Sequence, residues 1–290
     1  MINLVVYLKI GVVISNAQRS LLDRLKILED IVLEAEKLEY DAFFVTDHYM
    51  LPWSNETLES WIYLSYLSAK TSRIRLGTAV TPIPFRQPGV LAKMVSTLDV
   101  LSNGRAILGV GLGWYVPEFE AYSTWDPNNV RFEKTVEALN LITKLWIEEK
   151  VDFEGKYYKA KEAVLLPKPI QKPHPPLWFG GIGKKMLKLA AELGNGLICI
   201  GPRWLPTHVT SEDYGKIVER VRKIREVQNK TGDFTFACII TPPEDMREFI
   251  KEVEDYKRAG MNYLILGIVR VREGLSLVKR VYDEVISTIT

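Results

Sequence analysis

Apolar and polar residues recur along the chain with two different periods. Short runs rich in β-branched and aromatic residues alternate with longer segments in which apolar residues return every three or four positions. The short runs are predicted to be strands. They are NLVVYLK (3–9), DAFFVT (41–46), RIRLGTAV (73–80), RAILGVG (105–111), PLWFGG (176–181), GLICIG (196–201), FTFACII (234–240) and MNYLILGI (261–268).

The longer segments are predicted to be amphipathic helices. Residues 244–260 end at Gly260, a residue typical of the position after a helix. Residues 21–38 place one apolar stripe along a helix, made of Leu22, Leu25, Leu28, Ile31, Val32 and Leu38. Apolar strands separated by such helices indicate a parallel sheet covered by helices. Eight units of this kind predict an α/β fold of the (β/α)₈ TIM-barrel type.

The connections support one domain over residues 1–290. Links from helix to strand are short, whereas links from strand to helix, such as DHYMLPWSNE and GPRWLPTHVTSED, are long and chemically varied. In a (β/α)₈ barrel these long loops gather at the carboxyl ends of the strands, where active sites lie. Residues 149–176 are predicted to be an insertion between helix 4 and strand 5. The alternative is a proline-rich linker between two domains.

Composition indicates an ordinary soluble globular protein. The net charge of +2 and the even mixture of charges give no sign of a nucleic-acid partner. Apolar runs stay shorter than the about 18 residues of a membrane span, and the N-terminal residues lack the pattern of a secretion signal, so a cytoplasmic protein is expected. Cys199 and Cys238 lie in apolar runs and are predicted to be small buried hydrophobic residues. Three scattered histidines make a metal site improbable.

The stretch VTDHYMLPW (45–53) carries the strongest candidate chemistry. An apolar strand runs directly into Asp47 and His48 without a polar turn. A histidine at the carboxyl end of a barrel strand can transfer a proton near neutral pH, and an adjacent acid can orient it. The alternative is a strand-end histidine that is only hydrogen-bonded to the backbone. The predicted position on the catalytic face favours a functional role.

Aromatic residues and glycines occupy the other predicted strand ends. Trp53, Trp114 and Tyr115 could wall a pocket for a flat ligand or only cap the core. Glycines within strands mark either a close approach of a ligand to the backbone or tight packing. These glycines are Gly77 in the third strand and Gly109, Gly111 and Gly113 in LGVGLGW.

A glycine-rich turn in WFGGIGKK precedes a predicted helix. Its backbone N–H groups and the positive end of the helix could hold a phosphate, with Lys184 or Lys185 adding charge. The alternative is an ordinary helix start with solvated lysines. A P-loop is not indicated, because the GK[ST] ending is missing.

Three segments together resemble a known family. LGTAVTP, GRAILGVGLGWYVPEFEAY and FEGKYYKAKEAVLLPKPIQKPHPPLWFGGIGKKMLKLAAELGNG resemble, in order and spacing, the bacterial luciferase-like superfamily. Within it they are most similar to the branch that uses the deazaflavin coenzyme F420. The resemblance extends over residues 41–196.

The resemblance implies a (β/α)₈ barrel with an insertion before strand five and roles for the residues above. It implies a non-prolyl cis peptide at Gly77–Thr78 behind the flavin ring, and a cofactor-phosphate loop at Gly180, Gly181 and Gly183. Gly111 and Gly113 are expected beside the cofactor as well.

In the F420 branch, an Asp-His pair and a following tryptophan lie at the reactive edge of the coenzyme. Asp47 and His48 match the pair, and Trp53 matches approximately; the FMN branch tends to have Glu-His-His here. The chain also departs from the branch, because Trp114 stands where several members carry a proton-transferring glutamate. This departure disfavours a sugar-phosphate or simple alcohol substrate and leaves His48 as the leading acid or base.

The resulting hypothesis is an oxidoreductase that transfers a hydride between coenzyme F420 and a small organic substrate. His48 would move the proton, Asp47 would orient it, and Trp53, Trp114 and Tyr115 would line the substrate pocket. One alternative is an FMN-dependent monooxygenase that uses oxygen, and another is a flavin-binding protein without turnover. By analogy with the family, a homodimer is expected.

Overall fold

The computed structural model describes residues 8–18 and 20–286. These residues form two compact units that interleave along the chain. Unit 1 comprises the described residues of 1–15, 22–44 and 178–290, and unit 2 comprises those of 16–21 and 45–177. The single domain expected over 1–290 stays a prediction.

The core of unit 1 is a parallel set of strands. Their order across the sheet is β2 (Ala42–Val45), β1 (Lys9–Ile14), β11 (Tyr263–Ile268), β10 (Thr235–Ile240), β9 (Gly196–Ile200) and β8 (Leu177–Gly180). The strand predicted at 3–9 is wrong in position, since β1 begins at Lys9; residues 3–7 lie outside the described part. Cys199 and Cys238 are neighbours across β9 and β10 and both are buried, as predicted.

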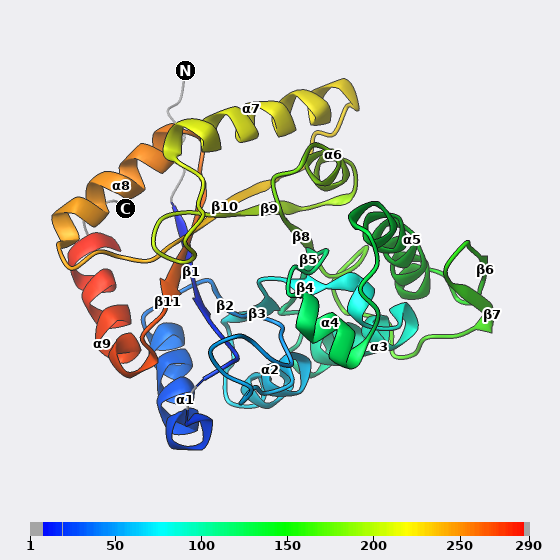
Figure 1. The fold of residues 1–290 in the computed structure, drawn as a ribbon, viewed down its shortest axis with the longest axis horizontal. Helices are drawn as coiled ribbons and strands as arrows, with labels where there is room; N and C mark the ends of the chain where they lie inside the picture. The colour runs from blue at the N-terminus through cyan, green and yellow to red at the C-terminus, as the bar shows by residue number, and fades with distance from the viewer. Residues whose placement is uncertain (1–7, 19, 287–290) are drawn as a thin grey trace. The chain divides into compact units, whose positions relative to one another are not determined.

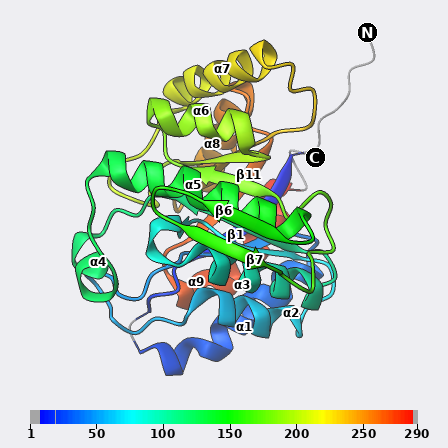
Figure 2. The ribbon, with the colours of Figure 1, turned by 90° about the vertical axis from the view of Figure 1, so that its right-hand side faces the viewer.

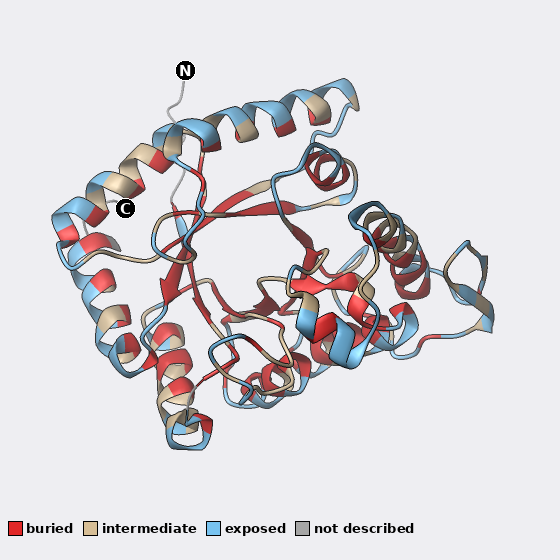
Figure 3. Ribbon diagram, in the orientation of Figure 1, coloured by how far each residue is buried: buried red, intermediate tan, exposed pale blue. Residues whose placement is uncertain are grey.

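Helices cover the strands of unit 1 (Figure 1). They are α1 (Leu21–Lys37), α6 (Lys184–Leu193), α7 (Ser211–Val227), α8 (Met246–Arg258) and α9 (Val271–Val281), with a π-helical turn η2 (Tyr282–Ile286). Figure 3 shows α7 and α8 buried on one side and exposed on the other. The stripe predicted for α1 is only partly right, because Leu28 and Ile31 are buried but Leu22 is 82% exposed. Gly260 follows α8 with φ +102°, as predicted.

Three short parallel strands of unit 2 pair with one another. They are β3 (Arg75–Thr78), β4 (Thr81–Pro82) and β5 (Ala106–Gly111), and both β3 and β4 pair with β5. The non-prolyl cis peptide lies at Ala79–Val80, so its predicted position at Gly77–Thr78 is wrong. Gly77 takes part in the regular pairing with Ile107, and the break in the ladder comes only after β3.

The helices of unit 2 are α2 (Ser60–Ser68), α3 (Pro88–Leu101), α4 (Val116–Tyr122) and α5 (Asn128–Ile147), with a 3₁₀ turn η1 (Ile83–Phe85). Helix α3 packs against α2 and α5. The indole of Trp146 on α5 donates a 2.9 Å hydrogen bond to the carbonyl of Ala92 on α3. Across the described residues, no helix combines the length and apolar character needed to cross a membrane.

The insertion predicted at 149–176 contains a hairpin between α5 and β8 in the chain. Its antiparallel strands are β6 (Val151–Glu154) and β7 (Lys159–Ala163). Glu137 on α5 accepts hydrogen bonds from the backbone N–H groups of Tyr157 and Tyr158, at 2.8 and 2.6 Å. The hairpin is therefore tied to α5, beside which it lies (Figure 2), and the segment does not act as a free linker.

The close approach of β3 to β5 requires Gly109. A Cβ atom at this position would lie 1.9 Å from the carbonyl oxygen of Thr78, which belongs to the backbone and cannot rotate away. Gly109 therefore allows tight packing of the two strands, which is the second of the two roles that the sequence analysis gave for strand glycines.

Replacing Gly109 with alanine should lower the free energy of unfolding by about 3 kcal/mol, because the added methyl group forces β3 and β5 apart. Urea denaturation would measure the loss. Gly89→Ala in α3 is the matched control, since a Cβ there meets no atom within 4 Å. Equal midpoints for the two variants would refute the packing role.

Candidate active site

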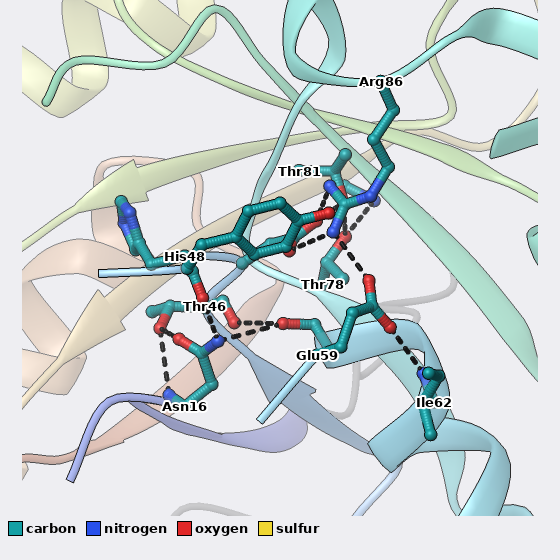
Figure 4. Close-up of polar contacts among 12 residues, drawn as sticks. Asn16, Thr46, His48, Glu59, Ile62, Thr78, Thr81 and Arg86 are labelled. Carbon is teal, nitrogen blue, oxygen red and sulfur yellow. Dashed lines mark hydrogen bonds and ion pairs between the residues drawn. The ribbon is translucent and has the colours of Figure 1, made fainter. Parts of the chain in front are cut away.

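Three consecutive residues after β2 bind three different partners within unit 2. Thr46 contacts Asn16, Asp47 contacts Arg86, and His48 contacts Glu118. An extended chain turns successive side chains in different directions, which lets one short stretch engage three separate segments. Figure 4 shows the His48 ring pointing away from the group around Arg86.

Asp47 lies in a buried ion pair with Arg86. Both terminal guanidinium nitrogens, Nη1 and Nη2, donate to the carboxylate at 2.8 Å, in the two-pronged geometry that suits arginine. The Asp47 side chain is 1% exposed and that of Arg86 is 6% exposed. Burial alone would lower the pKa of Arg86, but the Asp47 carboxylate outweighs it, and the pKa is raised. Arg86 is therefore a permanent cation in this site.

The ion pair extends to α2 and to Tyr49. Arg86 also donates to Glu59 at 2.7 Å, and Glu59 caps α2 by accepting from the backbone N–H of Ile62 at 2.8 Å. The guanidinium lies over the Tyr49 ring, 5.1 Å from its centroid. Burial raises the pKa of Tyr49, so its hydroxyl stays neutral. These contacts hold the loop after β2 against the start of α2.

Thr81 and Thr78 complete the surroundings of Asp47. The Thr81 hydroxyl donates to Asp47 at 2.8 Å and lies 3.0 Å from the Thr78 hydroxyl. Thr78 accepts from the backbone N–H of Gly109 at 3.3 Å and has no exposed surface. The side chain of Thr78 is enclosed by protein, and its predicted place beside a cofactor stays a prediction.

Glu118, and not Asp47, binds the ring of His48. Nδ1 of His48 lies 2.9 Å from Oε2 of Glu118, whose side chain is 1% exposed. The other oxygen, Oε1, accepts from the backbone N–H groups of Tyr49 and Met50 at 2.5 and 3.2 Å. The orienting role expected of Asp47 is thus filled by a residue of α4, because Arg86 and Thr81 occupy the Asp47 carboxylate.

Asn16 fixes the backbone of the same stretch. Its amide donates to the carbonyl oxygens of His48 and Leu58 at 2.7 and 2.9 Å, and its carbonyl accepts from the Thr46 hydroxyl at 2.9 Å. Figure 4 shows the bonds of Asn16 to Thr46 and His48 as dashed lines. His48 is therefore held through both its ring and its backbone.

Aromatic residues border the imidazole. The Trp114 ring meets the His48 ring edge-on, with centroids 5.7 Å apart, and packs against Tyr115 at 5.4 Å. Trp114 is 52% exposed, whereas the His48 side chain is 13% exposed. Trp53, also expected to line the pocket, is 44% exposed. A large exposed indole next to a partly accessible imidazole is typical of a ligand pocket.

Gly111 and Gly113 follow the packing reading, like Gly109. A Cβ on Gly111 would lie 2.5 Å from Val80, and one on Gly113 would lie 2.3 Å from Phe119. Gly113 also has φ +78°, which other residues rarely adopt. These glycines allow Trp114 and α4 to lie close to β4 and so shape the site; their predicted place beside a cofactor stays a prediction.

The glycine turn expected to bind phosphate lies in unit 1. Gly180 ends β8, Gly181 has φ +105°, and Gly183 precedes α6 without a side-chain cap. A Cβ on Gly183 would meet no atom within 4 Å, so the helix start is open. Lys184 and Lys185 are exposed beside it. An open, uncapped helix start fits an anionic group such as a phosphate.

Three residues of the site escaped the sequence interpretation: Arg86, Glu118 and Asn16. Arg86 stands in TPIPFRQP, another of the long links from strand to helix, and a lone arginine in such a loop was the available signal. Glu118 resembles an ordinary acid in the first turn of a helix. Asn16 carries no signal beyond its place after an apolar run.

The family model described as luciferase-like monooxygenase matches residues 8–263. The chain belongs to the luciferase-like monooxygenase family. The resemblance found in the sequence motifs is thereby confirmed.

A curated relative is the F420-dependent glucose-6-phosphate dehydrogenase of Kineococcus radiotolerans. It is 36% identical over 176 residues, which cover 59% of this chain and 51% of the relative. The chain thus spans about half the length of the curated relatives it matches.

Two solved structures share the fold. An F420-dependent secondary alcohol dehydrogenase, in complex with an F420-acetone adduct, has a TM-score of 0.79 and 22% identity over 96% of this chain and 98% of its own. The monooxygenase RslO1 from Streptomyces bottropensis has a TM-score of 0.81 and 18% identity over 97% of this chain and 100% of its own. The predicted (β/α)₈ TIM-barrel fold is confirmed.

Replacing Arg86 with methionine should lower the free energy of unfolding by about 3–5 kcal/mol, because Asp47 is left as a buried charge without its cation. Urea denaturation would measure the loss. Adding Asp47→Asn removes that charge and should restore part of the lost free energy of unfolding.

The matched control is Lys144→Met, which removes an exposed ion pair with Glu148 on α5. Its cost should stay below about 1 kcal/mol. If Arg86→Met is no less stable than this control, the buried pair does not organise the site.

Proposed function

We propose that this family member is an oxidoreductase that transfers a hydride between coenzyme F420 and a small organic substrate. The observation that carries the proposal is the partly accessible imidazole of His48, held by buried Glu118 and bordered by the exposed ring of Trp114. The names of the curated relatives and of one structural neighbour, all F420-dependent, support the choice of coenzyme.

Each unit, taken by itself, has a feature that suits part of such a coenzyme. In unit 1, the open start of α6 at Gly180, Gly181 and Gly183 would hold an anionic group such as a phosphate through backbone N–H groups. In unit 2, the exposed ring of Trp114 beside His48 suits a flat ring and substrate. The bound coenzyme would supply the two-electron chemistry.

His48 is the proposed acid or base, because among Asp47, His48 and Glu118 only its side chain is appreciably exposed. Asp47 and Glu118 are each 1% exposed. Asp47 would act by fixing the loop through Arg86. Trp53 and Trp114, with Tyr115, would wall the substrate and exclude water, as proposed from the sequence.

The alternative is an FMN-dependent monooxygenase, favoured by the family's name and by the similarity to RslO1. Titrating the purified protein with F420 and with FMN, followed by quenching of tryptophan fluorescence, separates the two. Tighter binding of F420, together with its reduction by one of a panel of small organic hydride donors, supports the proposal. FMN binding with oxygen consumption would replace it, and binding without any turnover would indicate a flavin-binding protein.

The proposed setting is a cytoplasmic homodimer that acts on a small molecule. The expectation rests on family analogy and on the composition of the chain. Light scattering of the purified protein would give the mass in solution, and a monomeric mass would contradict the dimer.

Replacing His48 with alanine should lower kcat by roughly 10²–10⁴-fold, the usual contribution of a general acid or base. The dissociation constant of the coenzyme should change by less than about twofold, because the ring is proposed to act on the substrate proton. Stopped-flow turnover and fluorescence titration would measure the two quantities.

His174→Ala is the control, since His174 lies in the insertion (149–176), where its ring packs against Trp146. It should leave both quantities unchanged. Equal losses of turnover and coenzyme binding in His48→Ala would count against the assignment of proton transfer.

A further inference from the structure

We propose that Glu118 is a positioning residue that fixes the neutral ring of His48 in one tautomer. In this tautomer the proton is on Nδ1, and Nε2 keeps the lone pair that faces the substrate. The tautomer itself is a property of the chain alone; only its effect on turnover rests on the proposed function.

The geometry around Glu118 supplies donors to both oxygens. Oε1 accepts from the backbone N–H groups of Tyr49 and Met50, and Oε2 lies 2.9 Å from Nδ1 of His48. An ionised carboxylate only accepts hydrogen bonds, so Nδ1 must donate. A neutral imidazole that donates at Nδ1 has its free lone pair at Nε2.

Among the described residues, the ring of His48 has no hydrogen bond to an acid other than Glu118. Both oxygens of Asp47 are engaged by Arg86, and Thr81 adds a third bond. The neighbour on the exposed side is the Trp114 ring, which meets the imidazole edge-on. The tautomer therefore depends on one bond, between Glu118 and His48.

Glu118 has two separable tasks, and glutamine distinguishes them. Oε1 holds the loop through Tyr49 and Met50, and the amide oxygen of a glutamine can take over these bonds. The amide nitrogen would replace Oε2, and it donates instead of accepting. Glu118→Gln should therefore keep the loop in place and move the proton of His48 to Nε2.

The first test is ¹⁵N NMR of protein labelled at histidine, without coenzyme, at a pH above the end of the imidazole titration. The chain has only three histidines, and His48→Gln assigns the signals of His48 by their loss. The wild-type ring should be protonated at Nδ1, and the Glu118→Gln ring at Nε2.

Glu120→Gln is the matched control. It makes the same chemical change in α4 at an exposed position and should leave the His48 signals unchanged. Wild-type protein protonated at Nε2, or an unchanged tautomer in Glu118→Gln, would overturn the proposal. The wild-type spectrum shows which nitrogen of His48 carries the proton even if the Glu118→Gln variant folds poorly.

The second test is kinetic. With the coenzyme that the titration identifies, Glu118→Gln should lose on the order of 10²-fold or more in kcat, with KM changed by less than about threefold. Unchanged kcat would show that the tautomer has no role in turnover. The spectra need no coenzyme, so they test the tautomer even if the F420 assignment is wrong. A wrong tautomer and a wrong coenzyme can therefore be told apart.

Discussion

The buried carboxylate of Asp47 is the constraint on which the site depends. An ionised group removed from water must be compensated by charge and hydrogen bonds, and here Arg86 and Thr81 provide both. Such a pair gives little net stability over an apolar core, but it tolerates only one arrangement of its members. It therefore fixes where the chain after β2 lies relative to β4 and α2 in unit 2.

The fixed position of Asp47 determines what its neighbour can do. Because Asp47 turns to Arg86, His48 turns the other way and meets Glu118. Asn16 holds the carbonyl of His48, so the ring is constrained from two directions. A catalytic group that is already oriented loses little entropy when a substrate binds, which is the physical advantage of this redundancy.

The fold could be predicted from the sequence because buried parallel strands are continuous apolar runs, as in β2 and β5. His48 could be singled out because it ends such a run. Its partners could not, since Arg86 is 39 residues from Asp47 and Glu118 is 70 residues from His48. Contacts over such distances along the chain depend on the packing of several elements. The sequence around a single helical carboxylate does not indicate which residue it will contact. Gly109 could be singled out, but its role could not, because the same glycine pattern suits a nearby ligand or a closely packed strand. Only the distance to Thr78 in the structure distinguishes these two roles.

Trp114 changes which groups can exchange protons with a ligand. An acid at this exposed position would add a second proton carrier beside His48, but the indole has no acidic or basic group in the ordinary pH range. The acid that this segment does contribute, Glu118, lies behind the imidazole and is 1% exposed. Its charge can act on the ring, but its own proton has no direct route to a substrate. Among Asp47, His48 and Glu118, proton exchange with a ligand is thereby concentrated on the imidazole, while the carboxylates act through it.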